Sequence, residues 1–331
     1  MSQTKVIQVG TGGFGLSWLE LLKDHDQVEV VGVVDVDEAN LIEAEKVLNG
    51  TKVDYFNNHV EAFQSLKADV AVIVTPPQTH KDIAKAALEH DLHVFMEKPI
   101  AHNLEDAVSL NEFAKDYSKH VMISQNYRYR PVIQALKNAV DKQLAGPIEY
   151  VEWNFRRATK FGGWRDHYDE ILIEDMSIHH FDMMRYLLGK NATTVYAKSM
   201  RPSWSWFNGN PTASISMTFE GVLINYFGSW VTSGPETSWN GDVKLYGEKG
   251  VIVLTSDRPV FIGSDGTEAN LPIPEMEHSD RTYSITELIQ AIKEKRTPAT
   301  AIADNLNSFK IVSASLESLK TGSEVSLNKY S

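Results

Sequence analysis

Residues 6–15 read VIQVGTGGFG, a short apolar strand that runs directly into a glycine-rich turn. In a G-x-G-x-x-G turn the first glycine permits the tight bend, the second lets a ligand approach the backbone, and the third lets the next helix pack on the strand. A helical pattern follows to about Lys23, and the N–H groups at its start attract an anion such as a pyrophosphate. The segment predicts a dinucleotide-binding turn; the alternative is a turn without a ligand. Its residues are Gly10, Thr11, Gly12, Gly13, Phe14 and Gly15.

Asp35 ends the next apolar strand and lies 20 residues beyond Gly15. Dinucleotide-binding folds carry at that distance the acid that binds a ribose 2′-hydroxyl. A carboxylate accepts hydrogen bonds from this hydroxyl in NAD and repels the 2′-phosphate of NADP. The following residues Val36 to Glu38 add no cation that would bind a phosphate. The sequence therefore favours NAD over NADP; the alternative is that Asp35 and Asp37 only cap turns.

The first 120 or so residues alternate apolar strands with helical patterns. Continuous apolar strands separated by helices indicate a parallel sheet covered on both faces. We predict a doubly wound α/β Rossmann domain over residues 1–124. The expected strands are Val6–Val9, Val28–Val34, Asp69–Val74, His93–Met96 and Val121–Ser124; the expected helices are Phe14–Lys23, Leu41–Leu48, Lys81–His90 and Leu104–Tyr117.

After about Arg130 the strands become longer and alternate apolar with polar residues, which indicates an antiparallel sheet with one covered face. Gly221 and the stretch Gly247 to Gly250 are expected to turn hairpins. We predict an α+β domain with a large, mostly antiparallel open sheet over residues 125–331. Its expected strands are Ile148–Phe155, Thr193–Met200, Ala213–Phe219, Val222–Val231, Asp242–Tyr246 and Val251–Leu254; its expected helices are Asp175–Leu188, Ser284–Lys295 and Ala303–Lys320.

Composition excludes several kinds of function. The 331-residue chain has no cysteine, which rules out disulfides, thiolate catalysis and cysteine-ligated metals. A net charge of -12 without a basic cluster argues against nucleic acid binding. No targeting segment precedes the first strand, and no apolar run approaches the roughly 18 residues of a membrane span. We therefore expect a cytoplasmic protein that binds neither nucleic acid nor membrane.

Five further motifs accompany the glycine turn: Thr75–His80, Glu97–Ile100, Gln125–Pro131, Glu174–Asp182 and the C-terminal Ser315–Gly322. Together with the glycine turn they resemble the Gfo/Idh/MocA oxidoreductase family, which includes glucose–fructose oxidoreductase and inositol dehydrogenases, over essentially the whole chain. Ser177 stands where the family often has glycine, and its small side chain should preserve the packing.

The resemblance implies a role for individual residues. Lys98 would lie between the nicotinamide ribose and the reacting hydroxyl, and Asp175 and His179 would face it from the second domain. Glu97 would contact the cofactor, and Pro99 would shape the strand end, with a cis peptide as one way to do so. The cofactor-binding set then comprises Gly10, Gly12, Gly13, Phe14, Gly15, Asp35, Thr75, Pro76, Pro77, His80, Glu97, Lys98 and Asn126.

The spacing of these residues also makes chemical sense. Asp175 and His179 are four residues apart on an expected helix, so they share one face, with Asp182 seven residues from the first. An imidazole is suited to removing the hydroxyl proton during hydride transfer, and a lysine stabilises the developing alkoxide. His180 is the rival to His179, and Asp182 is expected to be structural. A metal site at Glu174, Asp175 and His179 is conceivable but not favoured, so we predict no metal.

Candidate substrate residues are Arg128, Trp164, Arg165, Asp175 and His179, and the Trp204–Asn208 segment offers further aromatic side chains. Ring faces accept the C–H face of a pyranose or cyclitol, and Arg or Asp bonds its hydroxyls. The favoured function is an NAD-dependent sugar or polyol dehydrogenase. The alternatives are a glycosidase that uses NAD transiently and a non-catalytic dinucleotide sensor. The open sheet face predicts a homodimer or homotetramer.

Overall fold

The computed structural model describes residues 3–160 and 162–330, without the side chains of Trp164 and His167. Contacts within the chain divide it into two compact units. The first comprises Met1–Asn126 and His278–Leu306, and the second comprises Tyr127–Glu277 and Asn307–Ser331. The first division lies within two residues of the boundary expected after residue 124. Residues His278–Leu306, however, group with the first unit, whereas the sequence placed them in the second.

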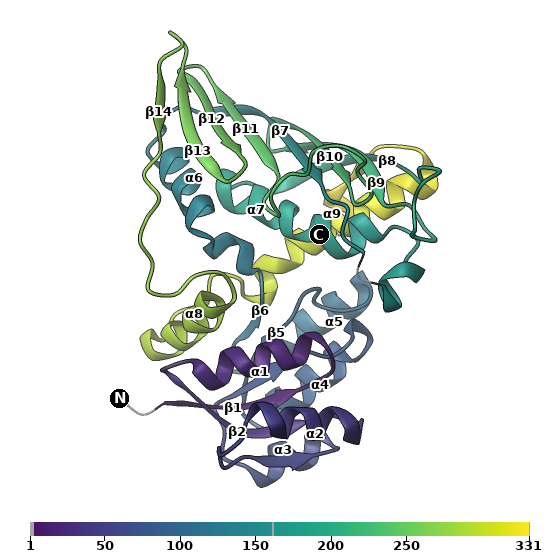
Figure 1. Cartoon of the computed structure of the whole chain (residues 1–331), viewed down its shortest axis with the longest axis vertical. Coiled ribbons are helices and arrows are strands. Elements are labelled where there is room, and N and C mark those ends of the chain that lie inside the picture. Colours follow the sequence, from purple (N-terminus) through teal and green to yellow (C-terminus); the bar gives the residue numbers. More distant parts are fainter. Residues whose placement is uncertain (1–2, 161, 331) are drawn as a thin grey trace. The chain divides into compact units, whose positions relative to one another are not determined.

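The first unit is built on a six-stranded parallel sheet with the order β3-β2-β1-β4-β5-β6. This is the doubly wound Rossmann order, and the prediction of the fold class is confirmed. The strands are short, and all except the edge strand β3 are mostly buried because helices cover both faces (Figure 1). The strands are β1 (Thr4–Val9), β2 (Val28–Val34), β3 (Asp54–Phe56), β4 (Val70–Ile73), β5 (His93–Met96) and β6 (Val121–Ile123).

Helices connect these strands, and most start with a side-chain cap. Asp37, Asn58 and Asn103 accept hydrogen bonds from the first-turn amides of α2, α3 and α5. The short elements β3 and α3 were missing from the expectation, because three to seven residues carry too little periodicity. The helices of this unit are α1 (Phe14–Asp24), α2 (Glu38–Val47), α3 (His59–Ser65), α4 (Pro77–Glu89), α5 (Leu104–Ala114) and α8 (Asp280–Glu294).

The outer edge of β6 is covered by a segment from far along the chain. The amide of Ile123 donates to the carbonyl of Thr300 at 2.9 Å, and the Thr300 hydroxyl donates back to the Ile123 carbonyl at 2.6 Å. Met122 forms an antiparallel bridge with Ala301. The edge strand of the parallel sheet is thereby paired by residues that follow α8.

The second unit contains a nine-stranded sheet, which confirms the expected large and mostly antiparallel architecture. Its one parallel pair among the described strands joins β7 to β10. The order is β14-β13-β12-β11-β7-β10-β9-β8-β15. The strands are β7 (Ile148–Arg156), β8 (Ala192–Met200), β9 (Thr212–Phe219), β10 (Val222–Ser229), β11 (Asp242–Gly247), β12 (Gly250–Thr255), β13 (Arg258–Gly263), β14 (Glu268–Asn270) and β15 (Val325–Ser326).

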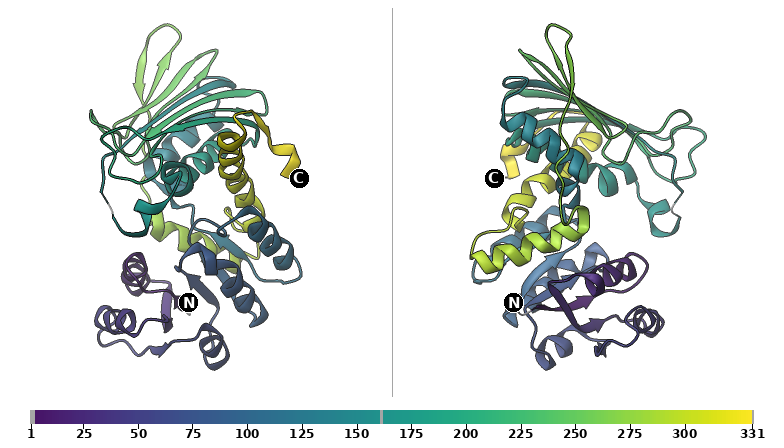
Figure 2. Two further views of the ribbon diagram at one scale, coloured as in Figure 1. Left: turned by 90° about the vertical axis from the view of Figure 1, so that its right-hand side faces the viewer. Right: turned by 60° about the vertical axis from the view of Figure 1, so that its left-hand side comes forward.

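The helices α6 (Pro131–Asp141), α7 (Ile178–Leu188) and most of α9 (Ile302–Thr321) lie on one side of this sheet (Figure 2). Strand β10 alternates buried and exposed residues because only one of its faces is covered. On the other face, Tyr150, Leu223 and Phe227 are exposed. Among the described residues, no helix combines the length and the apolar character that a membrane crossing needs.

Candidate active site

The glycine turn of the first unit has the geometry of a backbone cradle. Gly10 has a positive φ of 96°, and a Cβ added there would lie 2.5 Å from the carbonyl oxygen of Val74. A Cβ on Gly15 would lie 2.4 Å from the carbonyl oxygen of Gly10, so glycine is required for the helix to pack on the turn. Around Gly13, whose φ is 40°, the position of a Cβ is open space. The backbone is therefore accessible where a ligand would approach it.

The start of α1 differs from the capped helices of the same unit. Its N-cap is Gly13, no side chain caps it, and its first turn carries no acidic residue. The N–H groups and positive dipole end of this helix are therefore available to an anion. These features fit the pyrophosphate of a dinucleotide and support the predicted role of Gly10, Gly12 and Gly13.

Asp35 lies beside the turn and is buried. Its carboxylate accepts from the Thr11 amide at 2.7 Å, the Asp37 amide at 3.0 Å and the Asn40 side chain at 3.2 Å. Burial by itself raises the pKa of Asp35, but the hydrogen bonds from Asp37 and Thr11 outweigh it and hold the pKa below its usual range. Asp35 is therefore an anion that repels a nearby phosphate.

Arg281 is a residue that sequence reasoning missed. It belongs to α8, and its guanidinium donates to the Ser17 hydroxyl of α1 at 2.8 Å. The same group lies 5.1 Å from the centre of the exposed Phe14 ring and 5.4 Å from that of Trp18. A cation thus stands beside the first turn of the helix that follows the glycine turn. No local signal in the sequence links residues so far apart.

The loop after β4 leads into α4, which starts with Pro76 and Pro77. His80 in its first turn is completely buried, with Nε2 2.8 Å from the carbonyl oxygen of Thr75 and Nδ1 2.8 Å from that of Pro99. Burial lowers the pKa of His80, although these hydrogen bonds oppose the effect. The ring ties together the loops that follow β4 and β5, so its geometry fits a positioning role and not direct cofactor contact.

Glu97 and Lys98 follow β5 directly. Glu97 is buried and accepts from the indole N–H of Trp18 at 2.9 Å, which connects it to α1. Burial raises the pKa of Glu97, against the opposing effect of the Lys98 charge. Lys98 is partly exposed at the carboxyl end of the strand, where parallel sheets bind ligands. The Lys98–Pro99 peptide is cis, as the resemblance suggested.

Asn126 is also part of the first unit. It is buried in the 3-10 helix η1 (Asn126–Tyr129), and its side-chain amide donates to the carboxylate of Asp280 at the start of α8. This bond holds the chain after β6 against α8. Gln125, next to it, is buried with both side-chain polar atoms lacking a described hydrogen-bond partner. These amides are candidates for polar contact with a bound ligand.

In the second unit, Asp175 lies on a π-helical segment, Leu172–Ser177 (η3), which continues into α7. The sequence predicted an α-helix from Asp175, so its first turn differs from the expectation. Asp175 is buried, and its carboxylate accepts from Nε of Arg165 at 3.0 Å. Single π turns occur often at functional sites, because they change where side chains point. The structure therefore joins Asp175 and Arg165, two residues predicted together.

His179 follows in the first turn of α7 and is buried. Its ring stacks on the phenol ring of Tyr127, with centroids 4.3 Å apart and planes inclined by 9°. The guanidinium of Arg130 lies 3.3 Å from the centre of the same Tyr127 ring. The imidazole is thereby fixed in orientation by an aromatic residue that sequence reasoning did not single out.

His180, the rival of His179, is fully engaged in the core. Its Nδ1 lies 3.0 Å from the Tyr226 hydroxyl and its Nε2 lies 3.1 Å from the Trp239 carbonyl oxygen. Burial lowers the pKa of His180 to about 3. Ser177, in place of the expected glycine, is accommodated because its hydroxyl donates to the Leu172 carbonyl and meets the Tyr226 hydroxyl at 3.0 Å. This geometry favours His179 as the proton acceptor.

Arg128 and Asp182 form a buried bidentate ion pair. Nε and Nη2 of Arg128 donate to the two carboxylate oxygens of Asp182 at 2.5 and 2.6 Å. Ser308 of α9 also donates to Asp182, at 2.8 Å. The ion pair does not support the expectation that Arg128 contacts substrate, because the guanidinium already binds Asp182. The contacts of Asp182 with Arg128 and Ser308 fit the structural role expected for it. The Trp164 side chain, also predicted as a substrate contact, lies outside the described residues.

The Rossmann sheet with its uncapped helix and anionic Asp35 is typical of nicotinamide-dinucleotide oxidoreductases. Residues 4–125 match the model of the oxidoreductase family with an NAD-binding Rossmann fold. Residues 133–253 match the model of the GFO/IDH/MocA C-terminal domain. The chain belongs to the Gfo/Idh/MocA oxidoreductase family, and the resemblance seen in its motifs is confirmed.

Two dehydrogenases that resemble the chain in sequence cover 78% and 99% of it. D-apiose dehydrogenase from Rhizobium rhizogenes is 25% identical over 99% of this chain and 98% of its own length. Inositol 2-dehydrogenase from Rhizobium meliloti is 23% identical over 78% of this chain and 81% of its own length. An oxidoreductase from Agrobacterium radiobacter, solved with NAD+, L-tartaric acid and magnesium, has the same fold, with a TM-score of 0.90 and 22% identity over the whole of both chains. The relatives named for an activity are thus dehydrogenases and oxidoreductases.

Proposed function

We propose that this oxidoreductase transfers a hydride between NAD and a hydroxyl or carbonyl carbon of a sugar, cyclitol or related polyol. The observation that carries the proposal is the contrast between two adjacent histidines on α7. Both ring nitrogens of His180 have hydrogen-bond partners in the core. His179 instead stacks on Tyr127, and it follows by four residues Asp175, whose carboxylate binds Arg165. A fixed imidazole that follows a fixed carboxylate by four residues supplies the groups that proton removal from a hydroxyl needs.

The first unit supplies the residues that would hold the cofactor. Gly10, Gly12 and Gly13 leave the backbone open, and the uncapped start of α1 supplies N–H groups for the pyrophosphate. Arg281, beside Ser17, adds a cation to the same region. Asp35 would accept hydrogen bonds from the adenosine ribose hydroxyls and would repel a 2′-phosphate, which is why we propose NAD and not NADP.

The second unit supplies the acid–base chemistry. NAD held at the glycine turn would supply the acceptor for the hydride that leaves the substrate carbon. His179 removes the proton of the reacting hydroxyl, so that the C–H and O–H bonds are both lost and a carbonyl forms. Asp175, fixed by Arg165, accepts a hydrogen bond from a substrate hydroxyl and favours the positive charge that His179 acquires. Tyr127 restricts rotation of the imidazole through its stacked ring.

Lys98 completes the proposed site from the first unit. An ammonium group next to the reacting oxygen stabilises the developing alkoxide, or polarises the carbonyl in the reverse direction. Its position directly after β5, beside the buried Glu97, supports this role.

The named relatives support the substrate class. One acts on apiose and one on inositol, and both substrates present several adjacent hydroxyls. Arg165, Asp175 and the Trp164 position supply the groups that we assign to hydroxyl recognition. We also propose that the open face of the nine-stranded sheet pairs two copies of the chain, because Tyr150, Leu223 and Phe227 are exposed there.

The test is NADH absorbance of the purified protein with NAD across inositols, aldoses, anhydro-sugars, polyols and glycosides. We expect NADH from at least one polyol or sugar. We further expect that His179→Asn and Lys98→Ala each lower kcat by about 10²-fold or more. Both variants should still bind NAD, and Lys115→Ala, on the exposed end of α5, should match the wild type.

The opposite results are equally informative. NAD binding without NADH formation, with free sugar released from a glycoside, would replace the proposal by an NAD-assisted glycosidase. Tight NAD binding with no turnover of any compound would indicate a sensor. Unchanged kcat in His179→Asn would remove this residue from the mechanism.

A further inference from the structure

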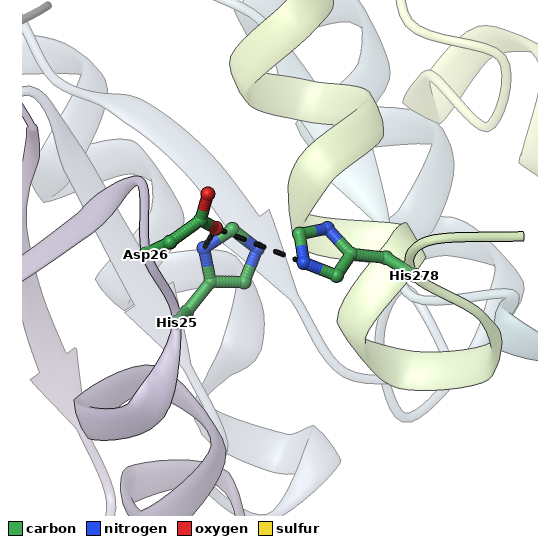
Figure 3. Close-up of side chains that lie close together, drawn as sticks. All are labelled: His25, Asp26 and His278. Atoms are coloured by element: carbon green, nitrogen blue, oxygen red, sulfur yellow. Dashed lines mark ion pairs between the residues drawn. The ribbon is translucent and has the colours of Figure 1, made fainter.

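A cluster of two histidines and an aspartate lies in the first unit, apart from every residue assigned above. His25 caps the C-terminus of α1, Asp26 follows it, and His278 comes just before α8. Nδ1 of His25 lies 3.4 Å from Oδ1 of Asp26, and Nε2 of His278 lies 3.7 Å from the same oxygen. Figure 3 shows the two imidazole rings and the carboxylate facing one another.

The far sides of both rings meet one hydroxyl. Nε2 of His25 lies 3.0 Å, and Nδ1 of His278 lies 2.9 Å, from Oγ1 of Thr286 in α8. That hydroxyl donates its single proton to the Thr282 carbonyl one turn earlier, at 2.9 Å, as helical threonines commonly do. It can therefore only accept from the two rings. We assign the ring protons to Nε2 of His25 and Nδ1 of His278.

This assignment leaves the nitrogens that face Asp26 without protons. The amide of Gln27 donates to Nδ1 of His25 at 3.2 Å, so this nitrogen carries a lone pair and no ring proton, and a bound ion would take the place of the amide there. Two imidazole nitrogens without ring protons and a carboxylate oxygen thus lie close together, an arrangement that a cation would stabilise.

We propose that His25, Asp26 and His278 bind a divalent transition-metal ion of the zinc type. The three ligand atoms lie within 4.8 Å of one another. In a tetrahedral zinc site, ligand atoms about 2.0–2.1 Å from the metal are roughly 3.3 Å apart, so a small movement of His278 closes the site. Imidazole nitrogen with one carboxylate oxygen favours zinc, nickel or copper over magnesium or calcium.

The surroundings match those of metal-binding histidines. Such residues usually donate their other ring N–H to a fixed acceptor, and here Thr286 serves both rings. Burial decreases from His25, whose side chain is 0% exposed, through His278 at 19% to Asp26 at 61%. An ion therefore has access from solvent, and water completes its coordination. Bound metal would fix the start of α8 to the turn between α1 and β2.

The experiment is calorimetric titration of ZnCl₂ into the full chain, prepared without a histidine tag and stripped with a chelator. We expect one zinc ion per chain with micromolar affinity, together with a rise in Tm. Asp26→Ala and His278→Gln should each weaken binding at least tenfold. His120→Gln is the matched control, because it alters another close histidine pair, His93 and His120, whose ring centroids are 5.2 Å apart.

A second pair of variants tests the shared acceptor. Thr286→Val removes the hydroxyl and should weaken zinc binding by about 10–100-fold, whereas Thr286→Ser should retain it. The proposal is overturned if zinc does not saturate a site at millimolar concentration, which would indicate an ordinary His278–Asp26 ion pair. It is equally overturned if either Asp26→Ala or His278→Gln binds zinc as the wild type does.

Discussion

The Asp35 side chain has a structural role in the glycine turn and, in the proposed function, also selects NAD over NADP. Its carboxylate is held by the Thr11 amide of the glycine turn and by the Asp37 amide at the start of α2. The neighbouring Asp37 caps α2 through the Ala39 amide. The sequence alone left open whether both acids only cap turns. The structure gives Asp37 that role and leaves Asp35 as the buried anion beside the turn.

Asp35→Ser is expected to weaken NAD binding and to raise the preference for NADP relative to NAD at least tenfold. The reason is that the serine removes the charge that repels a 2′-phosphate. Fluorescence titration with both cofactors measures the ratio. Asp37→Ser removes an equal charge but keeps a helix cap, so its ratio should not change; equal ratios in both variants would contradict the role given to Asp35.

His180 makes stability depend on pH. Burial lowers its pKa in the folded protein to about 3, whereas a histidine in an unfolded chain titrates near 6.5. Below pH 6.5 the unfolded chain takes up a proton that the folded protein does not. The free energy of unfolding should therefore fall as pH decreases from about 6.5 towards 3, with a slope from His180 of about 1.4 kcal/mol per pH unit.

Urea unfolding of the wild type and His180→Gln between pH 7 and pH 4.5 measures this slope. The variant should be less stable at pH 7, because glutamine cannot reproduce both bonds of the ring, and its stability should vary less with pH. His102→Gln, at an exposed histidine, should retain the wild-type slope. Parallel curves for wild type and His180→Gln would mean that His180 is not buried in its neutral form.

At the scale of elements, the glycines of the turn have two different roles: Gly15 allows helix α1 to pack, and Gly12 keeps the backbone open to a ligand. A Cβ on Gly15 would lie 2.4 Å from the backbone oxygen of Gly10, whereas a Cβ on Gly12 would meet only the flexible Asn40 side chain, at 3.3 Å. Gly15→Ala should destabilise the protein by on the order of 2–4 kcal/mol. Gly12→Ala should change stability by less than about 1 kcal/mol.

Gly12→Ala should nevertheless bind NAD at least tenfold more weakly, because the methyl group occupies the approach to the backbone. Urea unfolding and NAD titration of the two variants check both halves of this contrast. Normal NAD affinity in Gly12→Ala would mean that the cofactor does not approach the turn.

Much of the architecture followed from local pattern. The strands β1, β2, β4, β5 and β6 and the glycine turn were predicted because apolar runs, glycines and acids repeat at fixed short distances. The π-helical segment at Asp175 was not, since the pattern of an α-helix and that of one π turn differ by a single residue. Helix α6 was missed because the sequence around it was interpreted as a domain junction.

The residues of the candidate site also fall into those that the sequence predicted and those that it did not. Asp35, Asp175 and His179 were identified from spacing or from the family motifs. Arg281 and Tyr127 were not, because their partners lie far away in the chain, and the motif that contains Tyr127 does not show that its ring stacks on His179. The ion pair between Arg128 and Asp182, 54 residues later, could not be predicted either, because a buried ion pair depends on how helices pack and not on local sequence.

At the scale of the whole molecule, the open sheet face yields a prediction about assembly. Leu223→Glu places a charge among the exposed Tyr150 and Phe227 side chains and should shift the protein to a smaller species in light scattering. Ile273→Glu, at an exposed residue outside the named strands, is the control and should leave the mass unchanged. A wild-type protein that is already monomeric would end the proposal of a sheet-to-sheet dimer.

The paired edge of β6 predicts how a shortened chain behaves. Residues 1–126 alone lack the Thr300–Ala301 segment that pairs with Met122 and Ile123, so a strand edge is left open. This fragment should aggregate during size-exclusion chromatography. Attaching residues 278–306 through a flexible linker should restore a soluble fragment; equal solubility of both would show that the edge needs no cover.

Residues 278–306 belong to the first unit although they are made after most of the second, and this order affects folding during synthesis. A ribosome makes the six strands of the parallel sheet first, but Thr300, which pairs with their edge, lies 177 residues after Ile123. Folding in the order of synthesis therefore cannot finish the N-terminal half before the C-terminal half has largely been made. Until then the nascent chain exposes the edge of β6 and is a substrate for chaperones.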